Sequence, residues 1–389
     1  MGDQDTSSSG LNSYHAIIPG LPDDLALKCL AKVSHGYHGL LEVVCKRWRS
    51  LIRSSEYARA KAQEGWCGNW LFVLTEEQIK GPWNAYDPEA DRWHALPPIS
   101  WDSSNYNHRG FSCVTVAKKF LVIGGCYTPC DTLGQLKRFT ATNEVIQFDP
   151  FSKQWSRVAS MKVARCNFAC AVIHEKVYVA GGCSLSNAST LAHAEVYDPV
   201  EDSWQDIPPL PSAREDCAGF CCGGLFYVVA GIDNRAEQKT AEVFDPVKGS
   251  WYSHQNFWLF FRLMPCPLTT IKDCIYVIDD WDGNNVKFRD AATGCWITVG
   301  PVPSVQFSDL SRALKGFGFG LIGFQNDLYV LGGKVLKWEP SDGHWQNFEV
   351  VKLNVVRACK ISGTQPEWRE VRPIRGSHGA VVGCAVLEE

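Results

Sequence analysis

The sequence has little of what marks an exported, membrane-spanning or nucleic-acid-binding protein. Its first ten residues are polar and acidic, so no secretory or transit signal is visible. No apolar run approaches the roughly 18 residues that a membrane-spanning helix needs. Lys and Arg number 38 against 42 Asp and Glu, and no basic block occurs. We therefore expect neither a nucleic acid nor a membrane as a partner.

Motifs that hold metals or cofactors are also missing. No Cys-x-x-Cys occurs, the ten histidines are dispersed, and no glycine-rich phosphate loop follows an expected strand. The chain is long, lacks an export signal and has an odd number of cysteines, 17. These features favour reduced thiols in the cytoplasm or nucleus over a disulfide framework. We expect most cysteines to fill the core, and we expect no catalytic residue, metal or cofactor.

A repeated turn organises most of the chain. In its strongest copies an aromatic residue, an aspartate and a proline are followed by a tryptophan, six residues after the acid. The acid and tryptophan pairs are Asp87 and Trp93, Asp149 and Trp155, Asp198 and Trp204, Asp245 and Trp251, Asp290 and Trp296, and Glu339 and Trp345. Successive acids lie 45 to 62 residues apart, a period typical of propeller blades. Short β-branched and aromatic runs between the turns favour strands over helices.

A second marker, an apolar strand that ends in a glycine pair, precedes several of the turns. Examples end at Gly124–Gly125, Gly181–Gly182 and Gly332–Gly333. The six copies predict a mainly β fold, a six-bladed β-propeller whose last strand, Gly379–Leu387, completes the first blade. This count leaves Val350–Pro373, with its extra Trp368, unexplained. An added hairpin on the last blade would account for that segment.

Residues 17–62 read as short helices instead. Pro22 followed by Asp23 is a helix-start signal. Apolar residues then recur at helical spacing around Leu30 and between Val44 and Leu51. Three short helices in fewer than about 50 residues bury too little surface to be stable alone. We therefore expect this unit to pack against the propeller or a partner.

Both halves resemble known modules. Leu21-Pro22-Asp23, Leu30, and Val44-Cys45 with Trp48 and Leu51 resemble the F-box, and the turns with glycine pairs resemble the kelch repeat. An F-box followed by kelch repeats is typical of the plant F-box/kelch-repeat proteins. The resemblance implies a disordered tail over residues 1–16, a small α-helical F-box over residues 17–65, and a kelch-repeat propeller over residues 66–389.

This resemblance implies a ubiquitin-ligase adaptor rather than an enzyme. The F-box would dock on a Skp-type adaptor of a cullin-RING ligase, and the propeller would present a target protein for ubiquitination and degradation. By resemblance, the adaptor-binding residues are Leu21, Pro22, Asp23, Leu25, Leu30, Val44, Cys45, Trp48 and Leu51. Two alternatives remain open: a kelch scaffold that binds proteins without a ligase, and a propeller enzyme.

Four arginines recur ahead of the expected inner strands and suggest where a target would bind. They are Arg109, Arg165, Arg214 and Arg262. Equivalent positions on successive blades would converge on one face, where each guanidinium can hold a carboxylate with two parallel hydrogen bonds. We expect this face to bind an acidic stretch of the target, with loops 100–112 and 126–143 on its rim. Alternatively, the arginines pair with loop acids such as Glu215 and Asp216.

Overall fold

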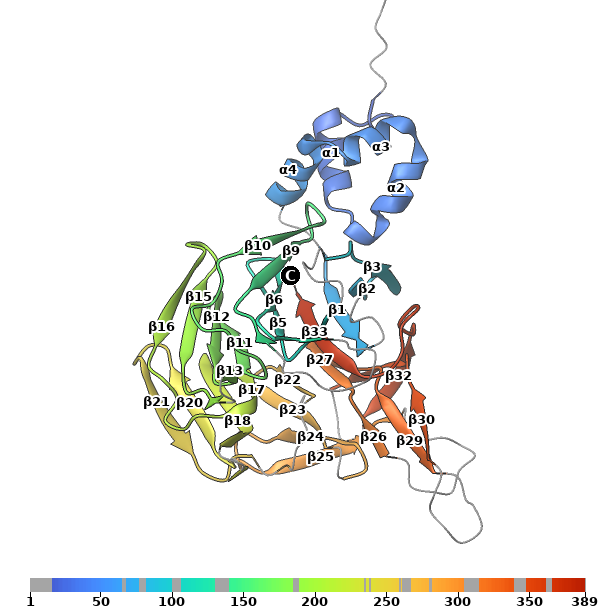
Figure 1. Ribbon diagram of the computed structural model, residues 1–389. Coiled ribbons are helices and arrows are strands. Elements are labelled where there is room, and N and C mark those ends of the chain that lie inside the picture. The colour runs from blue at the N-terminus through green and yellow to red at the C-terminus, as the bar shows by residue number, and fades with distance from the viewer. Residues whose placement is uncertain are drawn as a thin grey trace, which may run out of the picture. The chain divides into compact units, whose positions relative to one another are not determined.

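The chain folds into two compact units, Met1–Gly68 and Asn69–Glu389. The computed structural model describes residues 16–64, 68–76, 82–99, 106–129, 140–184, 189–233, 236–237, 239–258, 260, 267–279, 282–303, 315–338, 348–361 and 366–388. The predicted tail over residues 1–16 lies almost wholly outside these residues. Figure 1 shows helices in the first unit and strands in the second.

The first unit consists of α1 (Asp23–Ala31), a short 3₁₀ turn (His35–Tyr37), α2 (His38–Val44), α3 (Lys46–Ile52) and α4 (Ser55–Glu64). Pro22 precedes α1 with a φ of −54°, a conformation that its ring favours. Cys45 is extended between α2 and α3, and its sulfur accepts a hydrogen bond from the Trp48 backbone nitrogen. The core contains Leu30, Ile52 and Tyr57. The Tyr57 hydroxyl donates to the Leu30 carbonyl at 2.9 Å, which ties α4 to α1.

The second unit contains six four-stranded antiparallel blades, as predicted. From the inside outwards, blade 1 is β33 (Val381–Leu387), β1 (Trp70–Thr75), β2 (Asn84–Asp87) and β3 (Arg92–Ala95); blade 2 is β5 (Ser112–Val116), β6 (Lys119–Ile123), β9 (Val145–Asp149) and β10 (Gln154–Val158); blade 3 is β11 (Ala169–Ile173), β12 (Lys176–Ala180), β15 (Ala194–Asp198) and β16 (Ser203–Ile207). Blade 4 is β17 (Glu215–Cys222), β18 (Leu225–Asp233), β20 (Ala241–Asp245) and β21 (Ser250–His254), with β19 (Ala236–Glu237) beside β18; blade 5 is β22 (Leu268–Ile271), β23 (Cys274–Asp279), β24 (Asn285–Arg289) and β25 (Trp296–Pro301); blade 6 is β27 (Gly320–Phe324), β28 (Asp327–Leu331), β31 (Val356–Lys360) and β32 (Glu367–Val371).

Three smaller sheets lie outside the blades. They are β4 (Tyr106–Arg109) with β7 (Cys126–Pro129) and β8 (Thr140–Ala141); β13 (Cys183–Ser184) with β14 (Ser189–Thr190); and β26 (Lys315–Phe317) with β29 (Lys334–Trp338) and β30 (Phe348–Lys352). In the first of these sheets, β7 and β8 come from the segment between the second and third strands of blade 2, whereas β4 precedes the first strand of that blade; β13 and β14 lie between the second and third strands of blade 3.

The repeated turn has the same structure in several blades. The carboxylate of Asp149, for example, accepts hydrogen bonds from backbone nitrogens two and three residues later, which fixes the hairpin between the two outer strands. The following tryptophan then donates its indole N–H to the chain leaving the preceding blade. These bonds join Trp93 to Arg372, Trp155 to Pro97, Trp204 to Ala159, Trp251 to Pro208 and Trp296 to Phe257. The repeated tryptophan therefore holds successive blades together.

The strands that flank the sixth copy of the turn, β29 and β30, do not belong to a blade, contrary to the sequence prediction. Trp338 lies in β29, in the separate three-stranded sheet, while Glu339 and Trp345 fall outside the described residues. The outer hairpin of blade 6 is instead β31–β32, in which Cys359 pairs with Trp368. The insertion between β28 and β31 happens to reproduce the acid-to-tryptophan spacing, whereas the true hairpin has lost its Asp-Pro turn.

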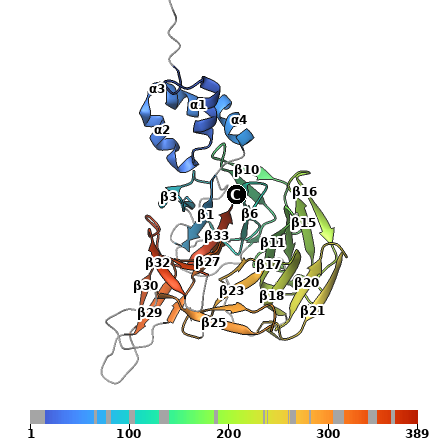
Figure 2. The same ribbon diagram turned by 180° about the vertical axis from the view of Figure 1, so that it is seen from behind.

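The end of the chain closes the ring. Residues Trp70 to Thr75 of β1 pair along their length with β33, beginning with Trp70 opposite Leu387. Both views show β33 in red beside β1 in blue (Figures 1 and 2). Strands from opposite ends of the propeller sequence therefore share one blade, and β1 is paired on both of its sides, with β2 and with β33.

Candidate functional site

The helical unit exposes apolar side chains on α1 and α2. Leu25 is 45% exposed, Leu40 50%, Val43 68% and Val44 60%. Other apolar residues of the unit pack into its core, so these four are available to a partner. Leu40 and Val43 were not selected from the sequence. Their position in the sequence could have indicated them, because Leu40 and Val43 lie on the same short helix as Val44. Neither side chain packs into the core of the unit.

Most of the predicted adaptor-binding residues are either exposed or half-buried. Pro22, Asp23, Leu25, Val44 and Cys45 are exposed, whereas Leu21, Trp48 and Leu51 are half-buried.

Two of these residues also hold the unit together. Leu30 is only 3% exposed and belongs to the core, so it supports the unit rather than a docking surface. The Trp48 indole N–H donates to the Ile17 carbonyl at 2.7 Å. These packing roles follow from their place on the inner sides of α1 and α3, which spacing alone did not reveal.

The propeller has a cavity of about 700 Å³ on its axis. Its wall contains residues of the innermost strand of every blade: β33, β5, β11, β17, β22 and β27. Charged residues Glu76, Arg109 and Asp216 and the aromatic rings of Phe111 and Phe319 also line it. A concave site with a few polar groups in an apolar wall is the usual form of a binding pocket.

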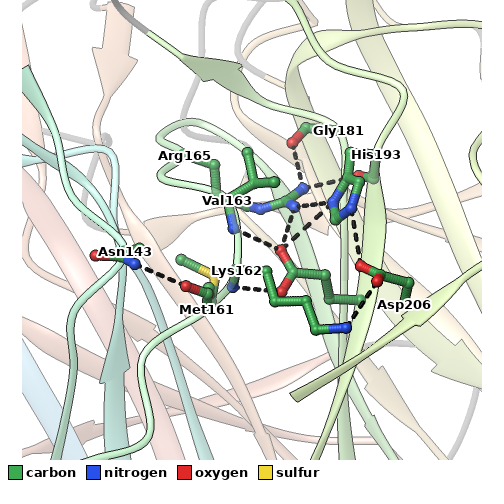
Figure 3. Close-up of polar contacts among 9 residues, drawn as sticks. Asn143, Met161, Lys162, Val163, Arg165, Gly181, His193 and Asp206 are labelled. Carbon is green, nitrogen blue, oxygen red and sulfur yellow. Dashed lines mark hydrogen bonds and ion pairs between the residues drawn. The ribbon is translucent and has the colours of Figure 1, made fainter.

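Two of the four predicted target-binding arginines are buried. The side chains of Arg165 and Arg214 are 0% exposed. Arg165 pairs with Glu195 at 2.7 Å and donates to the carbonyls of Gly181 and His193, as Figure 3 shows. Burial lowers the pKa of the Arg165 guanidinium, and the Glu195 carboxylate opposes this effect. Arg214 pairs with Glu242 at 2.9 Å in the same way. The prediction that these two arginines lie on an open face is wrong.

The pairing follows from a second repeat that the sequence contains. Glu195 and Glu242 each lie three residues before the turn aspartate of their blade, Asp198 and Asp245. In blade 2 the same position is Ile146, which cannot neutralise an arginine. The partners are therefore acids of the third strand, rather than Glu215 and Asp216, which the structure places at the start of β17 and not in a loop.

Arg109 does not occupy the position of the two buried arginines. Arg165 and Arg214 donate to carbonyls 16 residues later, at Gly181 and Ala230. His108 makes the corresponding contact with the Gly124 carbonyl, also 16 residues later and at 2.7 Å. Burial lowers the pKa of His108 to about 4, so this residue is neutral where the other blades have a cation.

The shift by one residue leaves Arg109 exposed at the axial cavity. No ion pair of Arg109 occurs among the described residues. Arg262 lies outside them, as do residues 100–105 of loop 100–112 and residues 130–139 of loop 126–143. Of the four predicted arginines, Arg109 is thus the one that the structure places within reach of a ligand.

The described residues contain no group of three or more His, Cys, Asp or Glu side chains arranged to hold a metal ion. Within this part of the chain, no helix is long and apolar enough to cross a membrane.

Comparisons with known proteins agree with the architecture. The F-box domain model matches residues 18–59, and the Kelch motif model matches residues 164–211 and 213–253. The two Kelch matches cover blades 3 and 4, which contain the buried Arg–Glu pairs. The solved structure of YjhT has a TM-score of 0.51 and 14% identity, covering 72% of this chain and 86% of that one. At that identity the similarity concerns the fold alone.

Two relatives from Arabidopsis thaliana align over almost the whole chain. The F-box/kelch-repeat protein SKIP30 is 28% identical, over 95% of this chain and 97% of its own length. The F-box/kelch-repeat protein At1g16250 is 46% identical over 376 residues, covering 96% of this chain and 97% of its own. Given an F-box match, six four-stranded blades and similarity of this extent, the chain belongs to the F-box/kelch-repeat protein family.

Proposed function

We propose that the protein is the substrate-recognition adaptor of a Skp–cullin–F-box ubiquitin ligase. Its helical unit binds a Skp-type adaptor, and its propeller holds a target protein for ubiquitination and degradation. The observation that carries the proposal is the exposure of Leu25, Leu40, Val43 and Val44 in the unit that matches the F-box. The protein supplies proximity and specificity, while the recruited ligase components supply the chemistry.

Truncating two of these side chains should weaken capture of the adaptor. Apolar anchors at the centre of an interface contribute more than about 1 kcal/mol each, so Val43→Ala with Val44→Ala should weaken binding roughly tenfold or more. Titration of a purified plant Skp protein against the full chain measures this change.

The propeller offers a matched control for this experiment. Val200 and Val247 are each 91% exposed, on outer turns of blades 3 and 4. Val200→Ala with Val247→Ala removes the same number of carbon atoms and should leave the affinity unchanged. Equal binding by all three proteins would contradict the assignment of this surface. No binding by the wild-type chain would instead favour a scaffold without a ligase.

We propose further that Arg109 contacts an acidic stretch of the target at the mouth of the axial cavity. Its guanidinium is exposed and has no ion pair among the described residues, in contrast to Arg165 and Arg214. The half-buried Phe111 ring, two residues away and lining the same cavity, adds apolar contact area. A single exposed cation beside an aromatic ring would favour a short acidic and apolar segment over an extended acidic tract.

Arg109→Glu should therefore release the target. The variant is made in the full chain that also carries Val43→Ala and Val44→Ala, because a decoy that cannot deliver its target retains it. We expect the proteins that copurify with this decoy from proteasome-inhibited cells to fall several-fold. Lys248→Glu, a charge reversal at a 75% exposed side chain on an outer turn, is the control. Retention of the same proteins by both variants would refute the role of Arg109.

A further inference from the structure

Three cysteine side chains lie together where blades 2 and 3 meet. Cys126 is 7% exposed, Cys166 0% and Cys183 5%, and they form one cluster. The sulfur atoms of Cys166 and Cys183 are 3.3 Å apart, and the thiols of Cys126 and Cys166 are hydrogen-bonded. Cys166 therefore sits between two other thiols, an arrangement that ordinary core filling does not require.

The backbone fixes the positions of these thiols. Cys126 and Cys183 each follow a glycine pair, and Cys166 forms an antiparallel bridge with Cys183. Gly182 keeps the two chains close: it has a φ of +91°, and a Cβ there would lie 2.6 Å from the Cys166 carbonyl oxygen. A side chain at this position would thus push the cysteine-bearing strands apart.

The cluster is connected to solvent and to positive charge. Cys126 lines the axial cavity, as does Arg109, and these two residues are paired across β4 and β7. A hydrogen bond from Cys166 and the charge of Arg109 lower the pKa of the Cys126 thiol, although burial opposes them. Cys126 lines the cavity whereas Cys166 and Cys183 do not, so Cys126 is the thiol of the three that a small oxidant in the cavity meets, and its thiolate is the nucleophile.

Two other thiols that line the same cavity have raised pKa values. Burial raises the pKa of Cys170 to about 12 and that of Cys384 to about 11. Both line the cavity beside Cys126, so they share its access to small solutes. Because access is shared, a difference in oxidation rate between Cys126 and these two cysteines would reflect the local chemistry of each thiol.

We propose that Cys126 and Cys166 form a peroxide-sensitive thiol pair at the mouth of the propeller cavity. The Cys126 thiolate attacks one oxygen of hydrogen peroxide, the O–O bond breaks, and the other oxygen leaves as water after taking up a proton. The Cys166 thiol then attacks the Cys126 sulfenic acid: an S–S bond forms, the S–O bond breaks, and the hydroxyl takes up the Cys166 proton and leaves as a second water. Two thiols are oxidised and one peroxide is reduced.

The disulfide would fix the position of the segment that presents Arg109. Cys126 belongs to the small β4–β7–β8 sheet, whereas Cys166 leads into the inner strand of blade 3. A covalent bond between them joins Arg109, across the strand pair, to the next blade. The inference concerns a modification site and holds whether or not the chain acts in a ligase.

The test uses the full-length, reduced protein treated with hydrogen peroxide, blocked with N-ethylmaleimide and cleaved with trypsin. Oxidation should join the peptide 120–137, which contains Cys126, to the peptide 166–176, which contains Cys166. Fragment ions distinguish Cys126 from Cys130 and Cys166 from Cys170 within these peptides. Loss of the free Cys126 thiol should be at least about tenfold faster than loss of Cys170 or Cys384, because so little of either is thiolate near neutral pH.

Three variants separate the roles of the cysteines. Cys166→Ser should leave Cys126 as a sulfenic acid that dimedone traps, Cys126→Ser should abolish the cross-link, and Cys183→Ser should preserve it. Equal oxidation rates for Cys126 and Cys170 in the wild-type protein would overturn the proposal without any variant. A cross-link from 166–176 to 177–214, which contains Cys183, in place of the expected one would do so as well.

Discussion

Removal of residues 378–389 should turn a folded protein into one that aggregates. These residues include all of β33, which lies beside β1 and forms the inner strand of blade 1. Without it, β1 has an unpaired edge in the middle of the propeller, and such an edge pairs readily with other chains. We expect this deletion to have the largest effect of any change considered for this protein.

The contacts of the deleted segment explain the size of the effect. Val381 donates its backbone N–H to Gly318 beside blade 6 at 2.8 Å, and Cys113 of blade 2 donates its thiol to the Cys384 carbonyl. Val381 and Leu387 are 4% and 3% exposed. Loss of β33 therefore removes apolar contacts and hydrogen bonds to both neighbouring blades as well as the pairing with β1.

Thermal unfolding, limited proteolysis and size-exclusion chromatography measure the outcome. A chain that lacks residues 388–389 alone keeps β33 whole and is the matched control. A 378–389 deletion that remained monomeric, with the melting temperature of this control, would show that the ring is closed by other contacts.

Replacement of Arg165 by methionine should destabilise the propeller by about 3–5 kcal/mol, because removing one partner of a buried ion pair leaves an uncompensated charge. Glu195 is 0% exposed, and its carboxylate also accepts the backbone N–H groups of Lys162 and Val163. These bonds hold the loop from blade 2 to blade 3 against the third strand (Figure 3). Without Arg165, the Glu195 carboxylate would have to take up a proton or move away and displace this loop.

A double variant separates loss of packing from loss of charge compensation. Glu195→Gln added to Arg165→Met removes the unpaired charge and keeps an oxygen for one of the two backbone donors, which bond to different oxygens of Glu195, so it should restore part of the lost free energy of unfolding. The neighbouring ion pair of Lys162 with Asp206 has exposed side chains, 47% and 54%. Lys162→Met should consequently cost at most about 1 kcal/mol.

Urea denaturation of the four proteins, followed by tryptophan fluorescence, gives the comparison. If Arg165→Met and Lys162→Met had the same effect, burial of the Arg165–Glu195 pair would not matter to stability. Arg165→Glu is unsuitable for locating a target site, because it places two carboxylates in a space without solvent. Any loss of target binding by that variant would report loss of structure.

The repeat made most of the fold predictable. Tryptophans at a fixed distance from an acid marked the outer hairpins of blades 1 to 5, and the apolar run at the end of the chain marked the closing strand. The outer hairpin of the last blade was not predicted, because it lacks the Asp-Pro turn. The insertion before it contains a chance copy of the acid-to-tryptophan spacing. Local motifs identify a hairpin only while the turn retains the residues that shape it.

The candidate sites were harder to predict, because they depend on which side chains remain exposed. A repeated arginine looks the same in sequence whether it faces a target or a buried glutamate in the third strand. The distance to the glycine pair, 15 residues for Arg109 but 16 for the buried arginines, carried the distinction. In the helical unit, the motif residue Leu30 proved to be core, whereas Leu40 and Val43, outside the motif, proved to be exposed.

The closure of the ring through β33 also determines the order in which the protein can be completed during translation. The hydroxyl of Thr75, the last residue of β1, and that of Ser377, shortly before β33, are hydrogen-bonded across 302 residues of sequence. Blade 1 emerges from the ribosome first after the helical unit, yet it stays without its inner strand until residues 381–387 have been synthesised. The nascent chain therefore has an open edge at β1 throughout elongation, and pairings between distant segments form slowly. We expect this protein to depend on a chaperone during synthesis, and pausing of translation near its end should increase the fraction that aggregates.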